Sequence, residues 1–306
     1  MSDPSRVAAA LAGISGILVT PFDAADVPAP ARLEPIIARA AAAGVAALTV
    51  NGNTSEFYAL TMAEAERMTE EVPALVARRA VTIAGVGRAV AEAAALAARA
   101  RRAGADAVMV HGLPDPFRAP RGGLDYVRRV ADAAGLPVVL YLRDDTMGAA
   151  GIEALTAIPG VIGVKWATPN VLLLAEMICR TAGRPLAWVC GLAEPWAPPM
   201  TAVGARGFTS GLINLLPGRS VAVLRALERG DMAAAAAEIA ALHEFEALRA
   251  EEGGGANVSV VKAALALVGE DVGPARPPAA WPLLPASADR LRALLAGWGL
   301  LSRAAA

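Results

Sequence analysis

The sequence predicts an α/β fold, a (β/α)8 TIM barrel with a C-terminal helical appendage. Short apolar runs alternate along the chain with segments that have the spacing of amphipathic helices. The apolar residues within each run are nearly continuous, which is typical of parallel strands buried on both faces. The chain has 306 residues. Barrels of this class use roughly 200 to 250 residues as one unit, so the length leaves room for a barrel and a smaller addition.

The expected strands follow one another at regular intervals. They are Gly13 to Phe22, Val45 to Gly52, Val81 to Gly87, Ala107 to Gly112, Pro137 to Arg143, Val161 to Ala167, Leu186 to Gly191 and Ala205 to Gly211. An open, doubly wound sheet is the alternative arrangement. No Gly-x-Gly-x-x-Gly turn follows the first strand to support dinucleotide binding in such a sheet.

A helical segment is expected after each strand. The segments are Ala31 to Ala43, Met62 to Arg78, Val90 to Ala103, Gly123 to Ala134, Gly151 to Ile158, Val171 to Thr181, Pro195 to Val203 and Pro217 to Arg229. Glycines that suit a left-handed helix cap follow several of them, as at Gly44, Gly104 and Gly135. Repeated strand-and-helix units predict a closed parallel barrel whose active site lies at the C-terminal ends of the strands.

The pattern changes after residue 229. Met232 to Glu251, Val258 to Val268 and Ser287 to Leu300 are predicted as helices with no strand between them. We therefore expect residues 1-229 to form the barrel catalytic domain and residues 230-306 to form a helical appendage packed on it. Lys262 falls within the second of these helices and is expected to be solvated or paired.

Composition limits the classes of function. Hydrophobic residues make up 56% of the chain, which supplies a large core, and the net charge of -1 provides no broad cationic surface for nucleic acid or anionic lipid. No stretch approaches the ~20 apolar residues of a spanning helix, and no signal peptide is recognised at the start. Cys179 and Cys190 lack a second pair of soft ligands, so no disulfide or zinc site is predicted. We expect a cytoplasmic protein without nucleic-acid or membrane partners.

One of the two lysines of the chain stands where a cation is costly. Lys165 closes the apolar stretch that begins at Val161. A charge at the end of a buried strand is unfavourable unless it is paired, loses its proton or is used chemically. Two structural interpretations remain open at this point. An arginine-rich composition explains the scarcity of lysine, and a lysine can extend its amine to the surface along its methylene stem.

Polar residues at the ends of several predicted strands would meet at one mouth of the barrel. They are Gly52, Asn53 and Thr54 after the second strand, Tyr141 and Arg143 on the fifth, Lys165 on the sixth, Gly191 on the seventh, and Thr209 and Ser210 on the eighth. A desolvated lysine with a lowered pKa can attack the carbonyl of a 2-oxo acid and form an imine, an electron sink for making or breaking a carbon–carbon bond. The Tyr141 phenol can shuttle the proton, and groups at Asn53 and Thr54 can hold the carboxylate. This chemistry needs no metal or organic cofactor.

At these residues the chain resembles the dihydrodipicolinate synthase and N-acetylneuraminate lyase family, the Schiff-base class I aldolases of pyruvate and related 2-oxo acids. The likeness rests, in order, on Thr20-Pro21-Phe22, Gly52-Asn53-Thr54-Ser55-Glu56, Tyr141 and Gly163-Val164-Lys165-Trp166-Ala167-Thr168. The resemblance implies that Lys165 forms the imine and that Tyr141 is the acid/base residue. It also implies that Asn53 and Thr54 hold the carboxylate, that Gly191 and Thr209 line the pocket, and that the protein is a homotetramer, a dimer of dimers.

The chain departs from the family pattern in three places. Ser55 replaces a glycine, so we expect a slightly reshaped carboxylate cradle. Thr146 stands where the lysine-pathway synthases of the family have an arginine that binds the second substrate. A tyrosine that reaches across the dimer in those synthases is missing from residues 111–117. These departures disfavour a role in lysine biosynthesis.

The residues at this mouth also allow other functional interpretations. The stretch from Glu56 to Thr61 and Arg143 resemble the 5-dehydro-4-deoxyglucarate dehydratase branch, which removes water and carbon dioxide from an extended diacid through the same imine, although Lys165-Trp166-Ala167 does not match its Lys-Asp-Gly pattern. The altered cradle also allows a non-catalytic small-acid-binding barrel, and a phosphate turn at residues 211–217 would suit a sugar-phosphate isomerase.

Individual residues have structural alternatives as well. Arg143 can pair with Asp144 or Asp145 at the rim, and Glu56 can brace its own loop. His111 can act as a base at the mouth or form a hydrogen-bonded wall. Trp166 can narrow the pocket.

Overall fold

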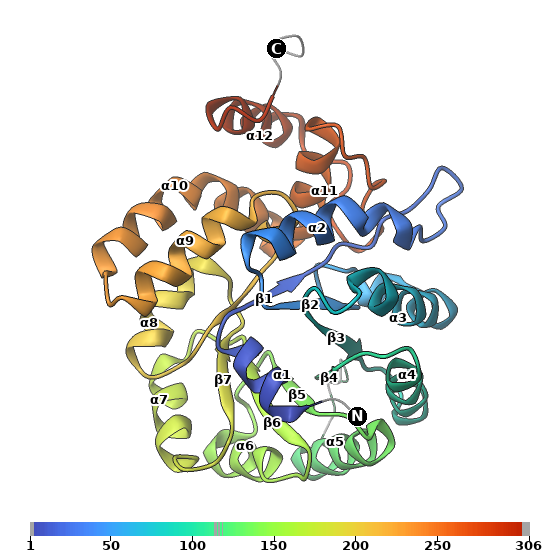
Figure 1. The fold of residues 1–306 in the computed structure, drawn as a ribbon, viewed down its shortest axis with the longest axis vertical. Helices are drawn as coiled ribbons and strands as arrows, with labels where there is room; N and C mark the ends of the chain where they lie inside the picture. The colour runs from blue at the N-terminus through green and yellow to red at the C-terminus, as the bar shows by residue number, and fades with distance from the viewer. Residues whose placement is uncertain (1–2, 113–114, 116, 118, 302–306) are drawn as a thin grey trace.

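The computed structural model describes residues 3–112, 115, 117 and 119–301. Eight parallel strands close into a barrel in sequence order, with the last strand paired to the first (Figure 1). The strands are β1 Ile14–Ile17, β2 Ala47–Val50, β3 Val81–Val86, β4 Ala107–His111, β5 Val138–Leu142, β6 Val161–Trp166, β7 Ala187–Cys190 and β8 Phe208–Ser210. Each lies inside a predicted run, so the predicted barrel is confirmed.

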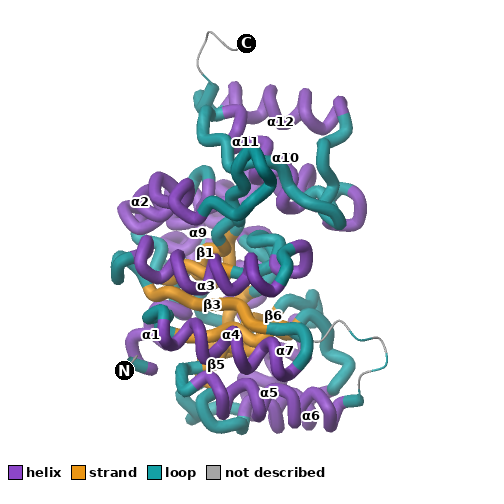
Figure 2. The backbone as a smooth tube through the Cα atoms, turned by 90° about the vertical axis from the view of Figure 1, so that its right-hand side faces the viewer, coloured by secondary structure: helices purple, strands orange, loops and turns teal. Residues whose placement is uncertain are grey.

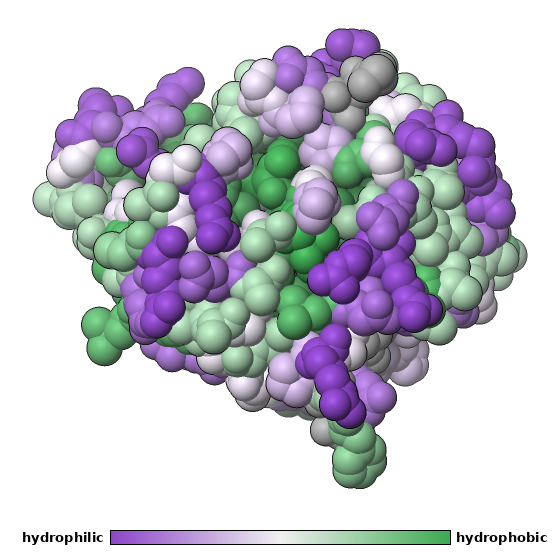
Figure 3. All heavy atoms as spheres, turned by 90° about the horizontal axis from the view of Figure 1, so that it is seen from below, coloured by the Kyte–Doolittle hydropathy of each residue, from purple (hydrophilic) through white to green (hydrophobic). Residues whose placement is uncertain are grey.

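Helices surround the barrel and follow the predicted segments. They are α2 Glu34–Ala43, α3 Met62–Val76, α4 Val90–Arg102, α5 Pro120–Ala134, α6 Gly148–Thr156, α7 Val171–Arg180, α8 Ala197–Ala202 and α9 Pro217–Glu228, with short 3-10 turns η1 Pro30–Leu33, η2 Phe57–Ala59, η3 Glu194–Trp196, η4 Leu212–Asn214 and η5 Glu252–Gly254. The glycines predicted as caps, Gly44, Gly104 and Gly135, all have a positive φ. Across the face seen from the side of α5 and α6, hydrophilic residues are interspersed with apolar ones (Figure 3).

A helix that sequence analysis did not predict precedes β1. α1 spans Pro4–Leu11 and is capped by Asp3, whose carboxylate accepts the Ser5 N–H at 2.9 Å. Val7 and Leu11 are buried against inward-facing residues of the strands. Figure 1 shows α1 lying across the barrel. The helix therefore closes the end of the barrel opposite the C-terminal ends of the strands.

Three helices follow the barrel without intervening strands, as predicted. They are α10 Met232–Ala250, α11 Asn257–Leu267 and α12 Pro285–Gly297. α10 packs on α9 and α11, and α12 is the farthest of the three from the strands (Figures 1 and 2). Among the described residues, no helix combines the length and the apolar character that a membrane span requires.

Alternation along the strands separates two apolar layers. Residues such as Tyr141 and Val189 face into the barrel and contact the inner cluster, whereas Leu140 and Trp166 belong to the cluster between the strands and the helices. Because successive side chains of a strand point to opposite faces, Lys165 faces inward where Trp166 faces outward.

Candidate active site

Lys165 and Tyr141 are neighbours inside the barrel. The register of β5 and β6 pairs the two residues, and the Lys165 Nζ lies 4.0 Å from the centroid of the Tyr141 ring. Burial, helped by the nearby charge of Arg143, lowers the pKa of Lys165 to about 7. Burial raises the pKa of Tyr141 to about 12. Near neutral pH the amine is therefore partly unprotonated while the phenol keeps its proton.

The turn after β2 holds Asn53 against Tyr141. The chain leaves β2 through Asn51, which has a left-handed backbone with φ of 56°. Asn53 Nδ2 donates a hydrogen bond of 3.0 Å to Tyr141 Oη. Thr54 is buried beside it. A β-carbon on Gly52 would lie 2.5 Å from Ile17 Cγ2, so only glycine allows the turn to approach β1 this closely.

Ser55 anchors this turn to the segment after β1. Its hydroxyl donates to Leu18 O at 2.6 Å and accepts the Gly52 N–H at 2.9 Å. Its carbonyl accepts a hydrogen bond of 2.6 Å from the Thr20 hydroxyl. The positive φ values in the turn belong to Asn51 and Glu56, not to Ser55. The serine therefore needs no strained backbone, and its side chain braces the cradle.

The ends of β7 and β8 place two predicted site residues at the interior and turn a third away from it. A β-carbon on Gly191 would lie 2.9 Å from Lys165 Cγ, so the glycine makes room for the lysine. Thr209 is buried and faces the interior. Ser210 was predicted to bind substrate, but its side chain faces away from the interior of the barrel. Its hydroxyl lies 3.1 Å from that of Ser220 on α9, because adjacent residues of a strand face opposite sides.

Arg143 lines two cavities at the mouth. The first, of about 430 Å³, is bounded by β4, β5, α5 and α6, and the second, of about 250 Å³, lies between the cradle turn and the C-terminal helices. Lys165 lines neither cavity. Tyr141, which its amine contacts, lines the first, and Asn53 lines the second. Asp145, a predicted partner of Arg143, instead accepts a hydrogen bond of 2.6 Å from Asn170.

His111 and Trp166 have structural roles. The His111 Nε2 is 2.8 Å from Asn51 O, and its ring stacks on Phe57 at 4.7 Å. Burial lowers the pKa of His111 to about 3, so it is a neutral wall of the site. Trp166 is fully buried against Trp188 in the outer layer, and the idea that it narrows the pocket is wrong.

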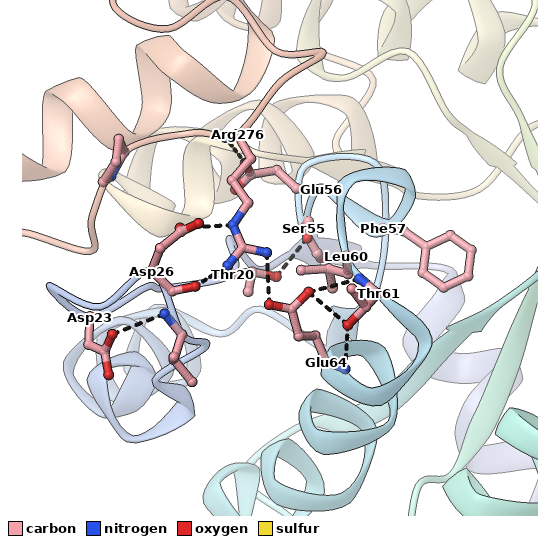
Figure 4. A network of polar contacts seen from close by, with 12 residues as sticks. Thr20, Asp23, Asp26, Ser55, Glu56, Phe57, Leu60, Thr61, Glu64 and Arg276 are labelled. Atoms are coloured by element: carbon pink, nitrogen blue, oxygen red, sulfur yellow. Dashed lines mark hydrogen bonds and ion pairs between the residues drawn. The ribbon is translucent and has the colours of Figure 1, made fainter.

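Glu56 ties the cradle turn to the C-terminal helices. Its Oε2 lies 2.5 Å from the Nζ of Lys262 on α11, and its Oε1 accepts the Arg276 N–H at 2.7 Å. Arg276 also bonds Asp26 and Glu64 (Figure 4). Lys262 is therefore paired and not solvated, and Glu56 braces its loop, the structural alternative given for it above. Sequence reasoning missed Arg276, although the scarcity of lysine already marked Lys262.

Comparisons with known proteins point to one family. The model of the dihydrodipicolinate synthetase family matches residues 10–296. A relative named 4-hydroxy-tetrahydrodipicolinate synthase 1, from Streptomyces coelicolor, is 34% identical over 298 residues, which cover 93% of this chain and 92% of the relative. A relative named probable 5-dehydro-4-deoxyglucarate dehydratase, from Rhizobium rhizogenes, is 32% identical over 238 residues, which cover 76% of this chain and 78% of the relative.

Solved structures give the same result. Dihydrodipicolinate synthase from Bacillus clausii superposes with a TM-score of 0.91 and 34% identity, covering 96% of this chain and 99% of that one. A prophage protein of the dihydrodipicolinic acid synthase family from E. coli K12, solved in complex with pyruvate, gives a TM-score of 0.83 and 26% identity, covering 94% and 98%. The barrel, the buried lysine and the match across nearly the whole chain lead to one conclusion: the chain belongs to the dihydrodipicolinate synthetase family.

Proposed function

We propose that this chain is a Schiff-base-forming lyase that binds pyruvate or a related 2-oxo acid as an imine on Lys165. One observation carries the proposal. The Lys165 amine is buried, 4.0 Å from the centre of the Tyr141 ring, and burial lowers its pKa to about 7. A neutral amine is a nucleophile, and a buried phenol that keeps its proton is an acid.

The mechanism assigns a step to each group. The Nζ of Lys165 attacks the C2 carbonyl, and water leaves as the C=N bond forms. Tyr141 protonates the departing oxygen and later takes a proton back. Asn53 donates to the phenol oxygen, which leaves the phenol's own proton available for the substrate. The imine then accepts the electron pair of the carbon–carbon bond that breaks, or releases it when a bond forms.

The remaining site residues have binding roles. Thr54 and Asn53 hold the C1 carboxylate, and Gly52 lets their turn lie close to β1. Thr209 and Gly191 shape the inner pocket, and Arg143 meets the far end of the substrate. We further propose that residues 1–229 carry the chemistry, that residues 230–306 brace it, and that the protein works in the cytoplasm as a homotetramer. These last points rest on the family resemblance.

A dehydratase that acts on 5-dehydro-4-deoxyglucarate or a similar diacid is the second candidate. Arg143 at both cavities supports it, since a guanidinium suits a second carboxylate. The names of several relatives support it as well. A non-catalytic acid-binding barrel has less support, because it depended on a distorted cradle and Ser55 braces the turn without strain.

Reductive trapping tests the proposal. The protein is incubated with pyruvate or a 2-oxo sugar acid, reduced with borohydride and weighed, and the modified peptide is mapped. We expect one adduct on Lys165 that is lost in Lys165→Ala. An unmodified chain would contradict the proposal and favour the acid-binding barrel or the isomerase. Measuring carbon dioxide release against aldehyde formation then separates dehydratase from aldolase.

A further inference from the structure

A buried arginine from the C-terminal helices reaches the carboxylate cradle. Arg249 lies near the end of α10 and is 5% exposed. A β-carbon placed on Gly211 would lie 2.8 Å from Arg249 Nη2 and 3.4 Å from the Thr54 hydroxyl. The guanidinium and the cradle hydroxyl are thus both adjacent to Gly211, at the end of β8.

The glycine at position 211 is required by this approach and not by the backbone. Its φ is -91° and its ψ is -20°, values that any residue adopts. A side chain there would collide with the guanidinium unless Arg249 shifted from its present position. The absence of a side chain at Gly211 is what allows Arg249 to stand next to Thr54.

The protein leaves some N–H groups of Arg249 unused. Nη1 donates to Glu246 at 2.5 Å, and Nη2 donates to Asn257 at 3.0 Å. Among the described residues Nε has no hydrogen-bond partner, although it is buried. A guanidinium has more donors than these two acceptors use, and an unmet buried donor is unfavourable. A carboxylate, which only accepts hydrogen bonds, is the group that such a guanidinium recognises best.

We infer that Arg249 is a binding residue for the carboxylate of the 2-oxo acid, which it reaches through the gap at Gly211. The inference rests on the proposed function and names a residue for it that lies outside the barrel. The C1 carboxylate is directly bonded to the carbon that Lys165 attacks, so it must sit at the cradle. Arg249 and Thr54 both lie close to the position that a β-carbon of Gly211 would take, and together they hold the carboxylate there. Glu246 balances the charge of the arginine when the site is empty.

A pair of ligands tests this role. Pyruvate carries the carboxylate, whereas methyl pyruvate offers the same ketone without the charge. Imine trapping is measured against the concentration of each ligand to obtain a half-saturation value. Arg249→Met removes the donors and keeps an unbranched side chain of moderate size. We expect it to raise the half-saturation value for pyruvate by about ten-fold or more, the loss typical of a charge-assisted hydrogen bond, and to leave that for methyl pyruvate unchanged.

Further variants separate recognition from folding. Gly211→Ala places a methyl group against Arg249 Nη2 without backbone strain, and we expect the same selective loss for pyruvate. Arg290→Met is the matched control, since Arg290 pairs with Glu244 and Glu251 at the surface of α12. We expect this control to leave the half-saturation values for both ligands unchanged.

Each other outcome has a definite meaning. An equal loss for both ligands in Arg249→Met would show a structural brace and overturn the inference, as would no loss for either. A wild-type chain that traps neither ligand would instead overturn the proposed function.

Discussion

The ion pair between Glu56 and Lys262 gives the sharpest prediction of stability. Its side chains are 2% and 0% exposed, and the two charged atoms are 2.5 Å apart. Lys262 also donates to Pro274 O at 3.0 Å and lies 4.2 Å from the centre of the Phe22 ring. Lys262→Met leaves the carboxylate of Glu56 buried without its cation. We expect this change to lower the free energy of unfolding by about 3 to 5 kcal/mol.

A double-mutant cycle isolates the pair from the rest of the site. Glu56→Gln removes the charge and keeps an oxygen that can accept the Arg276 N–H. Combined with Lys262→Met, it should recover about 1 to 3 kcal/mol relative to the sum of the single changes. Urea unfolding followed by circular dichroism measures all four proteins. The surface pair Arg67 and Glu71, 45% and 46% exposed, is the control and should couple by about 0.3 to 0.5 kcal/mol.

A weak coupling between Glu56 and Lys262 would refute this explanation. If the buried pair couples no more strongly than the surface pair, Lys262 does not stabilise the carboxylate, and the tie between the cradle and α11 is not electrostatic. If the coupling is strong, breaking the pair should also affect imine formation, because Glu56 belongs to the turn that positions Asn53. Lys262→Met should then slow imine trapping.

The remaining predictions concern the site itself. The rate of imine trapping should rise as the pH passes about 7, because Lys165 attacks as the neutral amine; a rate independent of pH from about 6 to about 8.5 would contradict the lowered pKa. Tyr141→Phe removes the shuttled proton and should slow turnover by about 10²- to 10⁴-fold in a steady-state assay, with the fold intact by circular dichroism. Gly191→Ala puts a methyl group 2.9 Å from Lys165 Cγ and should suppress trapping more than it lowers the melting temperature. Ser210→Ala should lower stability by about 1 kcal/mol and leave KM unchanged, and a raised KM would restore its predicted role in binding.

The pairing of Lys165 with Tyr141 could be predicted from the sequence because it depends on the order and the ends of neighbouring strands. Lys165 and Tyr141 each lie near the C-terminal end of an apolar run, and parallel strands that are neighbours in sequence bring such ends together. Placing both Thr209 and Ser210 at the mouth ignored the alternation of side chains along a strand. Adjacent residues of a strand face opposite sides, so only Thr209 faces the interior. The helix α1 escaped prediction because eight residues carry too weak a periodic pattern.

Contacts between the barrel and the C-terminal helices were beyond the reach of sequence patterns. Arg249 and Arg276 lie far along the chain from the turn that they approach, and nothing in their local spacing indicates these contacts. The proximity of Arg249 to Gly211 depends on how α10 packs against the end of β8. Such contacts depend on the tertiary packing of distant segments and not on the sequence of any one segment.

The placement of both lysines inside the protein has a practical consequence. Lys165 and Lys262 are 5% and 1% exposed, and the chain has no other lysine. Reagents that modify amines should therefore find no exposed lysine side chain on the folded chain. A lysine label that forms without unfolding would therefore report on an amine inside the protein.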